Sequence, residues 1–293
     1  MRVLVTGAGG TLGSEVVAHL TALGWSVRAH DRTPPQEAAP GPAAAAETAC
    51  GELLDPGHAR TVVSGMDAVV HAAALPSPGA GTEQEVFSNN VMAAYQVLGA
   101  AGRAGVPRIV YVSSLSALGM AWSVQDRSPT EIPVTEAHPC LAEDVYGLSK
   151  RLGELIAETV SRRWGSTVVS LRFPFLGSGD RLRAHLRHVQ ADPGRDRGAL
   201  WSWLDTRDAA RGIAAALTRP LTGHHLINLV APDTTATRPT RELLARYHPS
   251  APLDHAPDGF GTPYATGPAT RLLGFTTIHG WRQGAARQEE TSS

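Results

Sequence analysis

An α/β fold with a doubly wound parallel sheet is predicted by the order of elements at the start of this 293-residue chain. Residues 3–5 are β-branched or aliphatic and form a short apolar run, a glycine-rich turn covers 6–13, and residues 15–23 have the apolar spacing of a helix. A second strand is expected at 26–30, and the nearly continuous apolar run at 67–74 is typical of a central parallel strand. The length allows one large domain or a domain with a smaller lobe.

The turn between the first strand and the first helix is the most informative segment. Unpaired N–H groups and the helix dipole make such a turn an anion site. Glycine permits the tight turn at position 7, the approach of a pyrophosphate at position 10 and close helix packing at position 13. We therefore predict a dinucleotide site with contacts from Gly7, Gly9, Gly10, Thr11, Leu12 and Gly13.

An acidic residue ends the second strand, about 20 residues after the glycine turn. Asp31 can accept hydrogen bonds from the adenosine ribose hydroxyls and would repel a 2′-phosphate, so it favours NAD. Arg32 beside it, or Arg28, could instead hold that phosphate. NAD is the expected cofactor and NADP is the alternative.

Further cofactor contacts are expected where later strands end. A strand is predicted at 47–54 after a surface loop at 33–47, and Leu54 is assigned to the cofactor site. Ala72 and Ala73 are small enough for a cofactor to cross the strand end, whereas His71 is interpreted as structural. A long helix at 83–104 carries Asn90, which either contacts the active site or is a satisfied core amide.

The reaction is predicted to depend on a tyrosine and a lysine one helical turn apart. Tyr146 and Lys150 share a helix face because they are four residues apart. A nearby ammonium and the positive nicotinamide ring would lower the pKa of the phenol, which is near 10 for a free tyrosine. Lys150 can also hold the nicotinamide ribose, and Ser114 would hydrogen-bond the substrate oxygen.

These motifs resemble the extended short-chain dehydrogenase/reductases, the NAD(P)-dependent epimerase/dehydratase family. The resemblance is carried by residues 6–13, Asp31, 71–74, Asn90, 111–114, the Tyr146-x-x-x-Lys150 pair, Leu171-Arg-Phe-Pro174 and 203–210, and it weakens toward 272–275. It implies a Rossmann-type sheet of about seven strands with a small C-terminal substrate lobe. It also implies that Ser114 positions the substrate, Tyr146 transfers the proton and Lys150 supports both, and Pro174 is assigned to the cofactor site.

The domain division follows from the same resemblance. Residues 1–172 form the dinucleotide-binding core, to which the chain returns at about 203–230, and residues 173–202 and 231–293 form the substrate lobe and lid. Residues 288–293 are expected to be disordered.

Departures from the family pattern narrow the function. Leu115 and Ser116 follow Ser114 where family dehydratases carry an acid pair, so dehydration is not expected. The stretch 174–176 lacks the asparagine that usually holds the diphosphate of a nucleotide sugar, and only about 60 residues follow Val230. These features favour a smaller substrate.

The segment 180–197 is the candidate lid and contains five arginines, at positions 181, 183, 187, 195 and 197. They form either a solvated face or a site for an anionic substrate. Trp201 and Trp203 are candidates for one wall of the site. No metal is expected, because His185, His188, His224 and His225 lack a carboxylate or thiolate to complete a ligand set.

Composition excludes several other classes. A net charge of -1 gives no field that would attract nucleic acid or a membrane surface, and no apolar run is long enough to span a bilayer. Two cysteines and the absence of a signal peptide suit the cytoplasm. A homodimer is expected.

The leading hypothesis is an oxidoreductase that moves a hydride between a nicotinamide cofactor and a small hydroxyl or keto compound, such as a sugar or a sugar acid. The first alternative is a sugar or nucleotide-sugar epimerase that keeps NAD bound and forms a transient keto intermediate. The second is a non-catalytic NAD(P)-binding protein.

Overall fold

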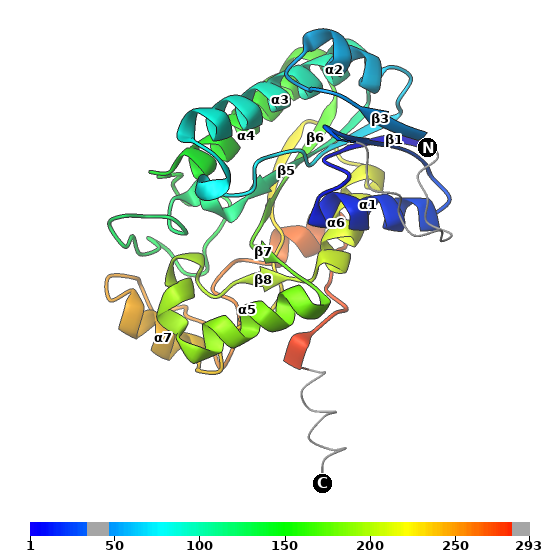
Figure 1. The fold of residues 1–293 in the computed structure, drawn as a ribbon. Coiled ribbons are helices and arrows are strands. Elements are labelled where there is room, and N and C mark those ends of the chain that lie inside the picture. The colour runs from blue at the N-terminus through cyan, green and yellow to red at the C-terminus, as the bar shows by residue number, and fades with distance from the viewer. Residues whose placement is uncertain (34–46, 283–293) are drawn as a thin grey trace.

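A seven-stranded parallel sheet forms the centre of the described part of the protein, residues 1–33 and 47–282 of the computed structural model (Figure 1). The order across the sheet is β3-β2-β1-β4-β5-β6-β9. The strands are β1 (Arg2–Thr6), β2 (Ser26–Asp31), β3 (Glu47–Cys50), β4 (Ala68–His71), β5 (Arg108–Ser114), β6 (Thr167–Phe173) and β9 (His224–Asn228). The predicted α/β class and strand number are confirmed.

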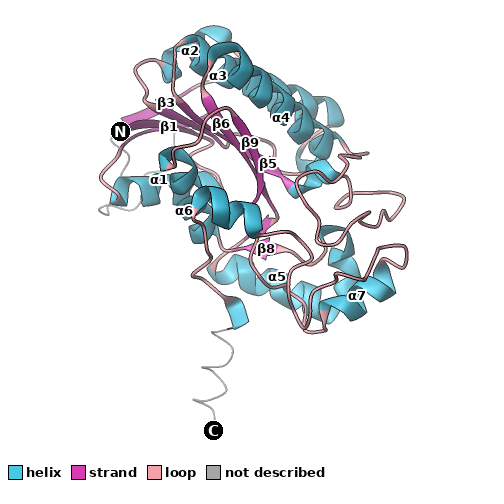
Figure 2. Cartoon of the chain, turned by 180° about the vertical axis from the view of Figure 1, so that it is seen from behind, coloured by secondary structure: helices cyan, strands magenta, loops and turns pink. Residues whose placement is uncertain are grey.

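Helices cover both faces of this sheet, as a doubly wound fold requires (Figures 1 and 2). On one face lie α2 (Pro56–Val63), α3 (Glu83–Arg103) and α4 (Val145–Trp164), and on the other lie α1 (Thr11–Ala22) and α6 (Thr206–Thr218). Successive side chains of a strand point to opposite faces. Val3 and Val5 therefore join the core under α1 and α6, and Leu4 joins the core under α2, α3 and α4.

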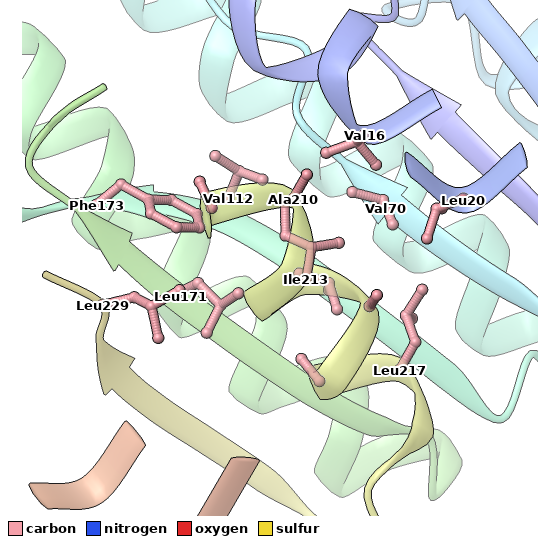
Figure 3. Close-up of a cluster of buried hydrophobic side chains, with 14 of the residues drawn as sticks. Val16, Leu20, Val70, Val112, Leu171, Phe173, Ala210, Ile213, Leu217 and Leu229 are labelled. Atoms are coloured by element: carbon pink, nitrogen blue, oxygen red, sulfur yellow. The ribbon is translucent and has the colours of Figure 1, made fainter. Parts of the chain in front are cut away.

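The core under α1 and α6 is largely aliphatic, and Ile213 of α6 is fully buried in it (Figure 3). Leu171 of β6, Val112 of β5 and Val70 of β4 meet it from the sheet, and Val16 and Leu20 of α1 close the cluster beside them. Burying side chains of this size contributes roughly 1.5–3 kcal/mol each. This packing fixes α1, and with it the glycine turn, against the sheet.

The direction of chain winding reverses between β1 and β4, which are adjacent strands separated in the sequence by two others. In open α/β sheets a ligand binds in the crevice at the carboxyl ends of strands at such a point. The turns after β1, β2, β4, β5 and β6 all open at this edge.

A second layer of structure lies beyond the carboxyl ends of the strands (Figure 1). It contains a two-stranded parallel pair and two helices: β7 (Phe175–Leu176), β8 (Trp203–Leu204), α5 (Gly179–Ala191) and α7 (Thr240–Tyr247). The short helical turns of the described chain are η1 (Pro78–Ala80), η2 (Leu115–Leu118), η3 (Pro193–Ala199) and η4 (Ala269–Leu273). Trp201, Leu244 and Tyr264 belong to a separate apolar cluster in this layer.

Several element bounds differ from the predicted ones. Helix α1 begins at Thr11 rather than 15, because the last glycines of the turn already have helical hydrogen bonding. Strands β3 and β4 are shorter than predicted, since their carboxyl ends leave the sheet toward the cofactor edge. The predicted loop at 33–47 and the predicted disordered tail at 288–293 fall largely or wholly outside the described residues. Within the described ranges, no helix has the length and hydropathy needed to cross a membrane.

Candidate active site

One large cleft, about 2110 Å³ in volume, runs along the carboxyl ends of the strands. Its lining begins at the glycine turn, passes Ser114, Tyr146 and Lys150, and ends against α5 and η3 of the second layer. The cleft thus joins a nucleotide-binding edge to a separate wall on which a substrate can rest.

The glycine turn has the geometry that the sequence predicts for a phosphate site. Gly7 has a φ of +71°, and a side chain at Gly13 would lie 2.0 Å from the Gly7 carbonyl oxygen, so α1 packs directly on the turn. The N-cap residue Gly10 offers no side chain to the first turn of α1, whereas α2, α3, α4 and α6 are each capped by an Asp or Thr side chain. All six predicted residues of the turn line the cleft. The uncapped N–H groups therefore fit a pyrophosphate.

Asp31 lies at the end of β2 with its carboxylate held in the cleft. Its Oδ2 accepts a hydrogen bond from the Gly9 N–H at 2.8 Å, and its Oδ1 accepts one from the Arg32 N–H at 2.7 Å. Arg32 also lines the cleft. Arg28 does not, because its guanidinium donates to the Val62 carbonyl at 2.7 Å and pairs with Glu47 at 2.9 Å. Of the two candidate phosphate ligands, only Arg32 lies at the site.

Leu54, Ala72, Ala73 and Pro174, which the sequence assigns to the cofactor site, all line the cleft. Asn90 does not. Its amide is buried, accepts from the Leu75 N–H at 2.8 Å, donates to the Leu75 carbonyl at 3.1 Å and donates to the Ser149 hydroxyl at 3.1 Å. The structure favours the core-amide interpretation: Asn90 ties the chain after β4 to α4 and positions the site indirectly.

Ser114, Tyr146 and Lys150 come together from the end of β5 and the first two turns of α4. The Lys150 ammonium lies 5.6 Å from the Tyr146 ring centroid and donates to the Val112 carbonyl at 2.9 Å. The Ser114 hydroxyl accepts from the Ser116 N–H at 3.1 Å, which fixes its direction. Asp144 caps α4 by accepting from the Gly147 N–H at 2.7 Å.

Burial shifts the pKa values of Tyr146 and Lys150 in the directions that favour their uncharged forms. The pKa of Tyr146 is raised to about 12, chiefly by desolvation, while hydrogen bonding with Ser114 acts in the opposite direction. Desolvation lowers the pKa of Lys150 to about 8, and Glu154 partly opposes this. The expected lowering of the tyrosine pKa is thus absent in the protein alone, because burial of the phenol outweighs the hydrogen bond with Ser114. The positive nicotinamide ring is the remaining charge that would favour the phenolate.

A buried ion pair anchors α4 to the sheet behind these residues. Glu154 accepts from the Arg172 guanidinium of β6 at 2.7 and 2.9 Å and from the Ser113 hydroxyl at 2.7 Å. Both charged side chains are essentially inaccessible. Sequence reasoning missed this pair, although a Glu one turn after the lysine and an Arg inside an apolar strand were visible signals. His71 is also structural: it is buried and shares a 2.9 Å hydrogen bond with Thr6.

The residues that line the far wall of the cleft differ in part from those that the sequence predicts. Of the five arginines, only Arg181 and Arg195 line the cleft. Arg183 pairs with Asp180, and Arg197 hydrogen-bonds the Gly194 carbonyl. The wall also contains side chains that the sequence did not single out or assigned no function, namely Trp122, Phe175, His185, Asp196 and Tyr264.

Trp201 and Trp203 do not form a wall of the site. Both are almost completely buried, and their indole N–H groups donate to the Pro193 carbonyl at 2.8 Å and to Asp233 at 3.0 Å. Their large apolar rings serve the cores on either side of β8.

A dinucleotide cleft that leads to a Ser, Tyr and Lys set defines an enzyme that uses a nicotinamide cofactor for hydride transfer, either as an oxidoreductase or as an epimerase. The chain belongs to the NAD dependent epimerase/dehydratase family, whose model matches residues 3–229. The resemblance stated from the motifs is confirmed, and NAD is the cofactor named in the family's own description.

Curated relatives include both reaction types. A uronate dehydrogenase from Pseudomonas putida is 30% identical over 227 residues, which cover 77% of this chain and 75% of that protein. A UDP-glucose 4-epimerase from Corynebacterium glutamicum is 26% identical over 95% of this chain and 92% of its own.

Solved structures support the fold. A short-chain dehydrogenase/reductase superfamily protein from Agrobacterium tumefaciens, determined with bound NAD, superposes with a TM-score of 0.71 at 24% identity and covers 99% of this chain and all of its own.

Proposed function

We propose that the protein is an NAD-dependent dehydrogenase that oxidises a hydroxyl group of a sugar acid to a carbonyl group. The observation that carries this proposal is the placement of Arg181 in the same cleft as Ser114, Tyr146 and Lys150. A cation at the far wall suits a substrate that is anionic at one end and oxidised at the other. The similarity to uronate dehydrogenase supports the same substrate class.

Arg181 is the best placed of the arginines to bind a carboxylate. Its Nε donates to the Leu176 carbonyl at 2.8 Å and its guanidinium lies 5.1 Å from the Phe175 ring centroid, which fixes the side chain. Its terminal nitrogens have no partner among the described residues, and planar guanidinium groups bind carboxylates through two parallel hydrogen bonds. Arg195 is already shared between Asp192 and His188.

The three residues at the centre of the cleft divide the chemistry. Ser114 donates a hydrogen bond to the substrate oxygen, Tyr146 receives the proton that the hydroxyl loses, and Lys150 holds the nicotinamide ribose and stabilises the phenolate. When bound, NAD supplies the acceptor for the hydride that leaves the same carbon. Asp31, held by Gly9 and Arg32, binds the adenosine ribose and disfavours a 2′-phosphate, which is why we propose NAD over NADP.

Substrate screening with an absorbance readout tests this function. Reduction of NAD at 340 nm should be seen with galacturonate or glucuronate and should be much weaker with galactose or glucose, which carry a hydroxymethyl group in place of the carboxylate. Arg181→Gln should raise KM for the uronate roughly tenfold, because a hydrogen bond to a charged group is lost. Arg183→Gln, on the same helix but outside the cleft, is the matched control. Equal activity on the acids and the neutral sugars would refute the proposal.

The same absorbance measurement distinguishes the proposed dehydrogenase from the alternative function, an epimerase. An epimerase would convert its sugar with no net change at 340 nm, because the hydride returns to the substrate. The stretch 174–176, which carries no asparagine for a diphosphate, and the presence of Phe175 and Arg181 at the cleft wall favour a small acid over a nucleotide sugar.

We also propose a division of labour along the chain and a dimeric assembly. Residues 1–172, with 203–230, bind the cofactor, and the segments 173–202 and 231–282 bind the substrate.

Phe87, Tyr95 and Leu155 are exposed apolar side chains on the neighbouring helices α3 and α4, a surface suited to a second copy of the chain. Light scattering should give twice the chain mass, and Tyr95→Lys should shift the protein toward monomer.

The two free thiols, Cys50 and Cys140, suit the reducing cytoplasm, where we expect the enzyme to act. Fractionation of cells that express the protein, followed by detection of the chain, checks this location.

A further inference from the structure

A histidine and an aspartate face each other on the substrate side of the cleft. His185 is on α5 and Asp196 is on η3, and the turn between these elements brings His185 Nε2 to 3.8 Å from Asp196 Oδ2. The side chains are only 13% and 15% exposed, and neither of the facing atoms has a hydrogen-bond partner in the described chain. Buried polar atoms are nearly always paired, so an unpaired couple beside a cleft calls for a functional explanation.

The environment keeps the imidazole neutral. Burial, together with the positive charges of His188 and Arg181, lowers the pKa of His185 to about 4. Burial raises the pKa of Asp196 to about 7. A neutral imidazole carries one N–H, and once Asp196 is ionised, above about pH 7, the carboxylate opposite Nε2 favours the tautomer with that hydrogen on Nε2. The other nitrogen, Nδ1, is then a hydrogen-bond acceptor.

Because Nε2 is fully buried, Nδ1 is the ring nitrogen of His185 that is left for a ligand. It has no hydrogen-bond partner among the described residues, and it is not one of the fully buried polar atoms. His185 itself lines the cleft. The ring stacks on Phe175 with centroids 3.8 Å apart and planes inclined by 13°, which prevents it from turning freely. Arg181 lies one turn earlier on the same helix and also packs over Phe175. The wall therefore presents a fixed acceptor beside a cation.

We propose that His185, oriented by Asp196, accepts a hydrogen bond from a substrate hydroxyl near the carboxylate that Arg181 binds, and so restricts the enzyme to hydroxylated acids. His185 is a specificity-determining residue in this arrangement, and Asp196 is a positioning residue that sets the tautomer. This inference rests on the proposed sugar-acid dehydrogenase function and adds the hydroxyl next to the carboxylate as a second recognised group.

Two variants test the pair against a matched histidine. His185→Phe keeps a ring on Phe175 but removes the acceptor, and Asp196→Asn keeps the shape but offers an amide N–H to Nε2, which turns Nδ1 into a donor. Each should raise KM for galacturonate or glucuronate roughly 3- to 10-fold with little change in kcat, as expected for one neutral hydrogen bond. His255→Phe, at an exposed position outside the cleft, should leave both constants unchanged. NAD titration and thermal unfolding show that each variant is folded.

A deoxy substrate distinguishes recognition from a structural role. The 4-deoxy analogue of the uronate should be a poorer substrate of the wild type by a similar factor, and His185→Phe should treat the two compounds alike. If the enzyme oxidises the uronate, but the wild type and His185→Phe discriminate equally between the uronate and its 4-deoxy analogue, the inference is wrong and the proposed function stands. If the wild type oxidises no uronate, both are overturned.

Discussion

Lys150 should cost the protein stability at neutral pH, and the size of this cost can be worked out from its environment. Its pKa is lowered from 10.5 to about 8 by burial, so the folded protein disfavours the ammonium. One pKa unit corresponds to about 1.36 kcal/mol, which places the cost at about 3 kcal/mol when both states are protonated, below about pH 8. A lowered lysine pKa means that the unfolded state binds more protons between pH 8 and 10.5. The cost therefore disappears as the pH rises through this range.

Replacement by methionine isolates this effect. Lys150→Met also removes the hydrogen bond to Val112, so a single comparison at one pH mixes two contributions. The difference in unfolding free energy between variant and wild type should instead be measured by urea titration at pH 7 and at pH 10, without NAD. The contact cost cancels, and the wild type should gain about 2 kcal/mol relative to the variant at the higher pH. A difference that does not change with pH would refute the reasoning, because Lys150 would then titrate normally.

Four further changes test the rest of the site. Tyr146→Phe should lower kcat on the order of 10²–10⁴-fold with NAD affinity retained. Tyr111→Phe is the control and should remain active, although the Tyr111 ring centroid also lies 5.6 Å from the Lys150 ammonium. An active Tyr146→Phe enzyme would overturn the mechanism. Ser114→Ala should reduce turnover with unchanged cofactor titration, and a loss confined to NAD binding would contradict its assigned role. Asp31→Ala should narrow the gap between NAD and NADP affinity in fluorescence titrations, and an unchanged ratio would mean that Arg32 governs the choice. Glu154→Gln should destabilise the fold by about 3–5 kcal/mol, since Arg172 is left buried and unpaired, while Glu158→Gln at the exposed pair with Arg162 should change unfolding by less than about 0.5 kcal/mol.

Features set by local spacing could be predicted from the sequence. The glycine turn, the acid that ends β2, and the tyrosine and lysine one turn apart depend on neighbours in the chain, and each is found at the predicted edge of the sheet. The prediction for Asn90 was less complete, because its partners Leu75 and Ser149 come from other parts of the chain.

Features that depend on tertiary burial were outside the reach of sequence reasoning. The pairing of β7 with β8 joins two-residue strands whose paired residues are 28 positions apart, with no periodic signal in either. The two tryptophans were expected at the cleft because their rings suit a binding wall, but the cores on either side of β8 take them instead. The pKa of Tyr146 is raised for the same reason: its desolvation is a property of the folded environment and not of its neighbours in sequence.

The anchoring of α4 has a consequence for how such an enzyme can change its substrate. Glu154 holds the helix to β5 and β6, and Ser149 holds it to α3. Gly153 lets the helix pack closely on β5, because a side chain at this position would lie 1.9 Å from the Tyr111 hydroxyl. None of these contacts involves residues 174–199, which supply much of the far wall of the cleft beside Trp122 and Tyr264. New substrate preferences can therefore arise by replacement of residues in that one segment while the reaction centre keeps its geometry. The fold therefore keeps the contacts that fix the reaction centre apart from the segment that shapes most of the far wall.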